Sequence, residues 1–354
     1  MKKYWILLVI GIISLGFVSC GDDDDDGGAS GTEADAGAVT DADGSKCYIT
    51  SIGDLASFEY DSNWRLTGWT HEDYYNWSVT YDPLYMVGQY VDEDDEEEET
   101  TVFSNFSLNS SGYITKFSAS QKYYDSYYDE SYSSTATYNF TYNSSGQLTE
   151  ITCSGSGKET YEGETYSESG SFTDTFTWSN GVITSYESTS SGSGTGYKYT
   201  DNETGTFDYG DNEYVNSTKQ YVYHVGEVIF GDYCELAILG YLGIGTTYLP
   251  VALSIEEEGE ETYDGEVETW SDSYTEDYSD EDEYGFNDNG TVSWEEWEGG
   301  TQYYTYSDGS STRANVRDMN SIDNGSKTRV RTRGCMNFLR KAMQRHRARR
   351  IAQE

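Results

Sequence analysis

The sequence has little proline, little cysteine and little positive charge for its length. Its 354 residues include 2 Pro, 5 Cys and 21 Lys plus Arg, against 64 Asp plus Glu, which gives a net charge of −43. Such an acidic chain repels nucleic-acid backbones, so we expect no nucleic-acid partner. The cysteines are scattered, without a Cys-x-x-Cys pair or a neighbouring histidine, so the sequence predicts no metal site and no cofactor.

Motifs of catalysis are also scarce. The three histidines, His71, His224 and His346, stand far apart, and no Gly-x-Ser-x-Gly nucleophile elbow is present. A carboxylate pair for glycoside hydrolysis cannot be singled out among 64 acidic residues. We therefore expect that the protein is not an enzyme.

Aromatic residues, in contrast, are abundant. The chain contains 35 Tyr, 12 Phe and 8 Trp. Each of these rings can bury a large apolar surface, which a disordered chain lacks. The acidic chain is thus predicted to fold around aromatic side chains.

The N-terminus has the pattern of a secretory signal over residues 1–19. Two lysines precede an apolar run over residues 4–18, which is shorter than the roughly 20 residues of a membrane-spanning helix. The ending before Cys20 resembles a bacterial lipobox, although Phe17 stands where Leu is more usual. The resemblance implies that Cys20 carries lipid and becomes the new N-terminus, so that outer-membrane lipid is a partner of the chain.

An acidic run directly follows Cys20. It resembles the export signal of Bacteroidota surface lipoproteins, which implies an outer-membrane protein that faces the cell exterior. The residues of this run are Asp22, Asp23, Asp24, Asp25 and Asp26. Residues 20–45 as a whole are rich in Gly, Ala, Ser, Asp and Glu without a hydrophobic period, so we interpret them as an acidic flexible tether.

An internal repeat is the most informative feature of the chain. Its copies begin with an aromatic residue, continue with Asn, Asp or Ser, and in four of five cases place Gly two or three residues later. They lie at residues 58–67, 106–115, 140–149, 176–184 and 284–293. Asn or Asp opens a type I turn and Gly takes its left-handed position, so each copy predicts a β-hairpin. Trp64 replaces Gly in the first copy, which costs about 1 kcal/mol or forces a different turn.

The segments between these turns alternate in polarity. Ala136, Tyr138 and Phe140, for example, alternate with Thr137 and Asn139, which is typical of strands that bury one face. We therefore predict an all-β fold for residues 46–311, an antiparallel meander of long hairpins that forms a curved sheet or a barrel. Aliphatic residues gather at 221–255 as the hydrophobic centre, where Asp232 is predicted to cap one short helix near 232–242.

Two acidic blocks and one glycine-rich segment are candidate binding sites by their composition. Residues 92–99 form a run of eight carboxylates that predicts a solvated loop, and residues 256–283 combine carboxylates with aromatic residues in the manner of strands. Residues 154–160 lack the spacing of a phosphate-binding loop and predict a Ser/Gly turn.

The C-terminal segment, residues 312–354, reverses the sign of the charge. It has 12 Lys plus Arg against 3 Asp plus Glu, a net of +9, whereas residues 20–311 have 7 against 61, a net of −54. Apolar and basic residues alternate near its end as in an amphipathic helix. Three interpretations stay open: docking on the acidic body, binding to anionic lipid or nucleic acid, and a non-native extension.

The hairpin copies resemble the tyrosine-aspartate repeats of bacterial surface proteins. Together with the lipobox, the acidic run and the segment 239–250, they also resemble an uncharacterised family of gut Bacteroidota lipoproteins, described as a domain of unknown function with a porin-like fold. That family implies no catalytic residues. We expect a non-enzymatic binding or structural module at the cell surface, with a glycan or protein as ligand. A surface polysaccharide hydrolase and an accessory subunit of an outer-membrane uptake complex are the alternatives.

Overall fold

The fold is dominated by long antiparallel strands, as the hairpin copies predicted. It is a computed structural model that describes residues 38–40, 46–71, 75–92, 97–126, 130–161, 163–211, 214–263, 265–277, 284–297 and 300–307. The strands are β1 (Ala38–Thr40), β2 (Lys46–Ile52), β3 (Ala56–Tyr60), β4 (Leu66–His71), β5 (Tyr75–Thr80), β6 (Tyr85–Asp92), β7 (Glu97–Leu108), β8 (Ile114–Asp125), β9 (Glu130–Tyr142), β10 (Leu148–Tyr161), β11 (Glu164–Ser179), β12 (Val182–Gly194), β13 (Tyr197–Asp208), β14 (Ala252–Tyr263), β15 (Glu266–Asp277), β16 (Tyr284–Phe286), β17 (Val292–Trp297) and β18 (Gly300–Tyr306).

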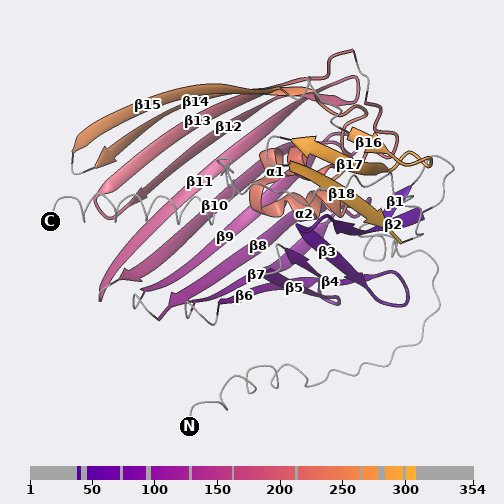
Figure 1. Cartoon of the computed structure of the whole chain (residues 1–354). Coiled ribbons are helices and arrows are strands. Elements are labelled where there is room, and N and C mark those ends of the chain that lie inside the picture. Colours follow the sequence, from indigo (N-terminus) through magenta and orange to yellow (C-terminus); the bar gives the residue numbers. More distant parts are fainter. Residues whose placement is uncertain are drawn as a thin grey trace, which may run out of the picture. The chain divides into compact units, whose positions relative to one another are not determined.

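The strands form a meander in which nearly every strand pairs with its neighbour in sequence. Antiparallel registers run without a break from β2 to β15, across the helical insertion between β13 and β14 (Figure 1). At the other end, β2 also pairs with β1 and with β18, which continues through β17 to β16. No register joins β15 to β16 among the described residues, so the curved sheet is not closed.

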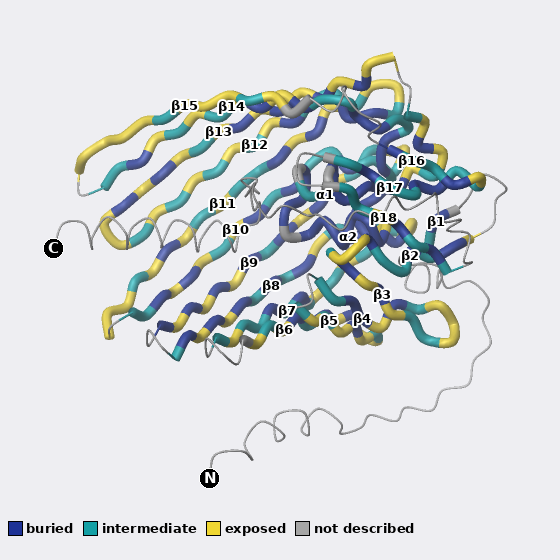
Figure 2. The backbone as a smooth tube through the Cα atoms, viewed as in Figure 1, coloured by how far each residue is buried: buried dark blue, intermediate teal, exposed yellow. Residues whose placement is uncertain are grey.

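The two faces of the sheet differ as the alternation predicted. Along β9, the side chains of Ala136, Tyr138 and Phe140 are buried, while Thr135 and Asn139 are exposed. The same alternation recurs in the neighbouring strands and is visible as alternating colours in Figure 2. We call the face with the buried aromatic side chains the inner face.

Two short helices pack against the inner face. They are α1 (Tyr223–Phe230) and α2 (Cys234–Ile238), joined by a 3₁₀ turn, and Figure 1 shows them against the concave side of the long strands. The ring of Tyr233 lies 4.8 Å from that of Tyr138 and 5.7 Å from that of Phe117. The hydrophobic centre predicted at 221–255 is therefore confirmed as a plug that covers the aromatic inner face.

The helical part begins earlier than predicted. The sequence indicated one helix near 232–242 capped by Asp232, but the chain is helical from Tyr223, and the N-cap residue of α2 is Tyr233, without a side-chain cap. The helix α2 ends at Ile238, and Gly240, two residues later, has a left-handed φ of +79°. Valine, isoleucine and phenylalanine in α1 suit a strand as well as a helix, which is why the pattern alone missed it.

Glycines within the strands lie opposite aromatic rings. A Cβ added to Gly205 would lie 2.0 Å from the ring of Tyr186, its direct partner across the strands. The same relation holds for five further pairs: Gly192 with Tyr199, Gly194 with Tyr197, Gly259 with Trp270, Gly285 with Trp294, and Gly88 with Trp77. Each ring covers backbone that has no side chain of its own, an arrangement that supports strongly curved strands.

Two predictions from the sequence are wrong. Residues 154–160 are no turn but lie in the second half of β10, where Gly157 lies opposite Glu168. Residues 92–99 are not wholly a loop, because β6 extends to Asp92 and β7 begins at Glu97. Within β7, the Glu99 carboxylate accepts hydrogen bonds from Tyr75 at 2.9 Å and Gln121 at 2.6 Å.

Three cysteines, Cys47, Cys153 and Cys234, are buried and form no disulfide bond with another described residue. Cys335 lies outside the described residues, as do Cys20 and the acidic run after it. Within the described ranges, no helix is both long and apolar enough to cross a membrane.

Candidate functional site

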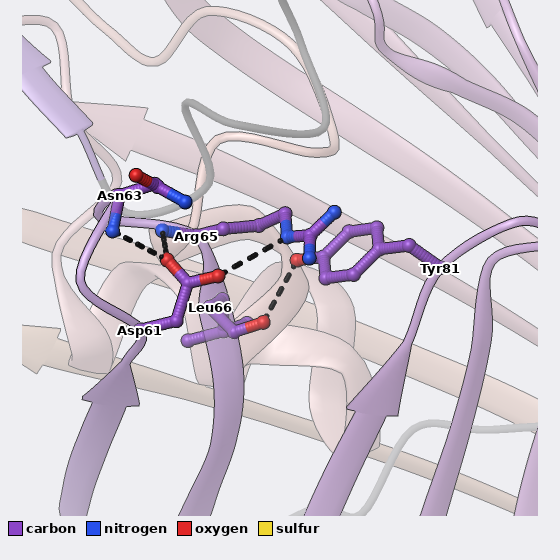
Figure 3. A network of polar contacts seen from close by, with 5 residues as sticks. All are labelled: Asp61, Asn63, Arg65, Leu66 and Tyr81. Atoms are coloured by element: carbon purple, nitrogen blue, oxygen red, sulfur yellow. Dashed lines mark hydrogen bonds and ion pairs between the residues drawn. The ribbon is translucent and has the colours of Figure 1, made fainter.

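The turn between β3 and β4 carries the most distinctive surface of the protein. It belongs to the first hairpin copy, and Asp61 organises it: its Oδ1 accepts the backbone N–H groups of Asn63 at 2.8 Å and Arg65 at 3.0 Å. These two backbone hydrogen bonds hold the pKa of Asp61 below its usual value, so the carboxylate stays ionised. Figure 3 shows this arrangement.

Trp64 adopts the left-handed conformation that glycine takes in the other copies. Its φ is +60°, compared with +77° to +84° at the glycines, which are Gly112, Gly146, Gly181 and Gly290. The N–H of Trp64 donates to the carbonyl of Asp61, as the N–H groups of Gly112, Gly146 and Gly290 donate to the Asn three residues before each of them, so these four copies share one turn. The copy at residues 176–184 differs, because Asn180 and Gly181 are both left-handed. A non-glycine residue pays about 1 kcal/mol or more in this region, so the tryptophan is held there against its backbone preference.

The indole of Trp64 is part of a small aromatic group that we call the aromatic platform: Tyr48, Tyr60 and Trp64. The ring of Trp64 stacks on that of Tyr48, with centroids 5.0 Å apart and planes 12° apart. Tyr60 meets Tyr48 edge-on at 5.5 Å, and its hydroxyl donates to the carbonyl of Ile49 at 2.8 Å. Burial, with a smaller contribution from neighbouring tyrosines, raises the pKa of Tyr60 above its usual value, so it stays neutral. Trp64 nevertheless keeps 43% of its surface exposed.

Charged groups flank the aromatic platform. The Arg65 guanidinium lies 4.6 Å from the centroid of the Tyr81 ring, and its Nε lies 3.4 Å from Asp61 Oδ2. The hydroxyl of Tyr81 donates to the carbonyl of Leu66 at 2.9 Å, which fixes the ring beneath the guanidinium (Figure 3). An exposed indole beside a fixed carboxylate and a fixed guanidinium can stack on a flat apolar surface and hydrogen-bond to polar groups at its rim.

The polar contacts under the plug serve a different purpose. His71 on β4 pairs with Glu235 of α2, and although burial raises the pKa of Glu235, the charge and hydrogen bond of His71 outweigh burial and lower it overall. Similarly, the hydroxyl of Tyr304 donates to Glu295 at 2.5 Å and accepts the backbone N–H of Tyr223 at 2.6 Å. Both contacts tie the helical segment to the sheet. His71 therefore has a structural partner in Glu235.

The site residues predicted from the sequence lie elsewhere. Cys20, the acidic run Asp22 to Asp26 and His346 all lie outside the described residues. His224 lies within α1. The described part of the chain has no group of three or more His, Cys, Asp or Glu side chains placed to hold a metal ion.

One feature of the repeat pointed to the aromatic platform. Trp64 stood out as the exception to the repeat, but nothing in the pattern indicated its stacking on Tyr48, which lies on a different strand. Likewise, the contact of Arg65 with Tyr81 joins residues 16 positions apart. Register and strand curvature decide such contacts, and neither can be derived from a single sequence.

Comparison with known proteins identifies the family. A family model described as a domain of unknown function (DUF4595) with porin-like fold matches residues 58–282. A porin-like protein from Bacteroides vulgatus is 11% identical, with a TM-score of 0.42, over 74% of this chain and 99% of its own. One from Bacteroides uniformis is 18% identical, with a TM-score of 0.33, over 76% of this chain and 94% of its own. A search of the curated proteins finds no match. Since the family model covers more than half of the sequence, the chain belongs to this family of domains of unknown function with a porin-like fold.

Proposed function

We propose that the chain is a lipid-anchored surface protein whose β domain binds a glycan at the aromatic platform and catalyses no reaction. The signal pattern of residues 1–19, Cys20 and the acidic run after it support lipid anchoring at the outer membrane with the body facing outward. The long β hairpins then hold the platform on a rigid scaffold at the cell surface.

The observation that carries the binding role is the exposed, left-handed Trp64. Three copies of the same turn use glycine, which adopts this conformation without strain. Trp64 takes the strained conformation and keeps 43% of its surface exposed, and strained residues cluster at ligand sites. Its ring suits the apolar face of a sugar, while Asp61 and Arg65 offer an acceptor and donors for hydroxyl groups.

The test is glycan binding by the full mature chain and two variants. A panel of plant, mucin and microbial polysaccharides is screened first, and any ligand is then titrated by calorimetry. We expect saturable binding that Trp64→Gly weakens by about tenfold or more, since aromatic residues at binding sites commonly contribute over 1 kcal/mol.

Tyr124→Ser is the matched control. Tyr124 is 45% exposed, close to the 43% of Trp64, but it lies on β8, away from the turn. This variant should bind as the unmodified protein does. A chain that binds no polysaccharide, or two variants that lose binding equally, would contradict the proposal.

A further inference from the structure

The inner face of the long strands is acidic away from the plug. We call six carboxylates there the inner acidic face: Asp125, Glu130, Glu159, Glu168, Glu203 and Glu261. All six side chains are buried, and they come from β8, β9, β10, β11, β13 and β14. Burying so many carboxylates is costly unless positive charge lies nearby or some of them take up protons.

The positive charges of these strands lie on the opposite face. Strands β8–β15 contain four lysines and no arginine: Lys116, Lys122, Lys158 and Lys198. All four are exposed, and by the alternation of each strand they point away from the inner face. The four lysines of these strands therefore lie on the face opposite the inner acidic face.

Glu168 gives a second, independent indication of a missing donor. Its side chain is only 5% exposed, and its Oε2 accepts a hydrogen bond from the hydroxyl of Tyr197. Its other oxygen, Oε1, is buried and has no hydrogen-bond partner. Buried carboxylate oxygens are usually satisfied, so this atom points to a donor outside the described residues. A metal ion fits poorly, because no metal-binding cluster is formed by the described side chains.

The chain itself contains a segment of complementary charge. Residues 312–354 have a net charge of +9, mostly from arginine, whose guanidinium pairs well with carboxylates. The described body ends at Ser307, where β18 pairs with β2, and 47 residues follow. Even as a continuous helix, these residues would extend about 70 Å, compared with about 40 to 55 Å for strands of 12 to 16 residues. The segment can therefore reach any part of the inner face.

We propose that the basic segment 312–354 docks on the inner acidic face of strands β8–β14. Docking places guanidinium groups among carboxylates that the fold has already withdrawn from water. It selects the first of the three interpretations of this segment, docking on the body, over binding to lipid or nucleic acid.

Limited proteolysis of the full chain tests the docking. Trypsin cleaves after Lys and Arg, and the segment offers 12 such residues. The inner-face variant Glu159→Gln/Glu261→Gln is compared with an outer-face variant, Glu256→Gln/Glu258→Gln, whose exposed carboxylates lie on β14. Both variants change the net charge equally. Mass spectrometry of the intact protein measures the loss of the segment over time.

We expect the inner-face variant to lose the segment about tenfold faster than the unmodified chain, as for two weakened ion pairs. The outer-face variant should behave as the unmodified chain does. Salt at about 0.5 M should accelerate cleavage of the unmodified chain, because it screens ion pairs. Equal cleavage rates in all three proteins would overturn the proposal.

Carbodiimide cross-linking of the unmodified chain keeps the test decisive if the inner-face variant fails to fold. Lys327 and Lys341 should link to carboxylates of β8–β14 that point inward. Links confined to the exposed Glu256, Glu258 and Glu260, or links between isotope-labelled and unlabelled chains, would contradict docking within one chain.

Discussion

Trp64 shows how a single residue departs from a local rule without changing the backbone. The turn keeps the conformation of three glycine copies, while the side chain gains stacking on Tyr48 and remains 43% exposed. A residue that the fold required would be buried or would relieve strain, and Trp64 does neither. Trp64 keeps the turn although its own backbone conformation is strained. This combination is the basis for assigning it to ligand binding.

Replacing Trp64 by glycine should therefore leave stability nearly unchanged. The substitution relieves about 1 kcal/mol of left-handed strain and removes ring stacking worth about 0.5 to 1.5 kcal/mol. We expect the free energy of unfolding, measured by urea titration, to change by less than about 1 kcal/mol. A loss of about 3 kcal/mol, the size of a core truncation, would mean that the tryptophan is structural.

Glu168 predicts a pH dependence of stability. Burial raises the pKa of Glu168, the hydrogen bond from Tyr197 lowers it, and the nearby Glu159 raises it. The net result is a rise of the pKa from 4.5 to about 8. Because the raised pKa favours the protonated form in the fold, folding takes up a proton between these values. The contribution of Glu168 to stability is therefore most favourable below pH 4.5 and declines as the pH rises to about 8.

The isosteric variant Glu168→Gln removes this titration. Relative to the unmodified chain, its free energy of unfolding should rise steadily between pH 4.5 and about 8 and level off above. Denaturation at a series of pH values measures the difference. A difference that does not depend on pH would show that Glu168 titrates normally in the fold.

At the scale of strands and helices, glycine and aromatic residues act together. In each of six direct cross-strand pairs, the ring occupies the space above a glycine, so the missing side chain is part of the packing. This is why glycines in the middle of long strands do not break them, although glycine in a strand usually weakens it.

Gly205→Ala tests this packing. Its Cβ would lie 2.0 Å from the buried ring of Tyr186, so the ring must move, and overpacking of this kind costs about 1 to 3 kcal/mol. Gly226→Ala in α1 is the control, because its nearest neighbour is 3.5 Å away and alanine favours a helix by about 0.5 to 1 kcal/mol. We expect the thermal midpoint to fall for the first variant and to rise for the second. If both thermal midpoints changed in the same direction, the packing of the rings would not depend on the glycines.

The sequence predicted the hairpin turns and the alternation of the strands because both depend on local residue chemistry. It failed where a local signal had two meanings. Gly157 indicated a turn but lies within β10, and the apolar residues of α1 suited strand and helix equally. The inward position of Glu159 and Glu203 was missed because aromatic and polar residues share that face. Only the register brings Glu203 to the hydroxyl of Tyr186, at 2.7 Å.

At the scale of the whole molecule, negative and positive charges are concentrated in different parts of the chain. Residues 20–45, the predicted tether, are acidic, but Ala38–Thr40 within them form β1 and pair with β2. The basic segment 312–354 has the opposite sign of charge to the body. A body of this charge repels anionic lipid, so the proposed surface location depends on the proposed lipid anchor at Cys20. The aromatic platform can meet an external glycan only if the body faces outward.

The most direct test of a surface-displayed binding module is protease digestion of intact cells that express the full chain. The folded body is probed beside a periplasmic control protein, before and after permeabilisation of the outer membrane. Display on the cell surface predicts that the body is lost from intact cells while the control is spared. A body that survives on intact cells and is digested only after permeabilisation would contradict surface display and, with it, the proposed binding of external glycans.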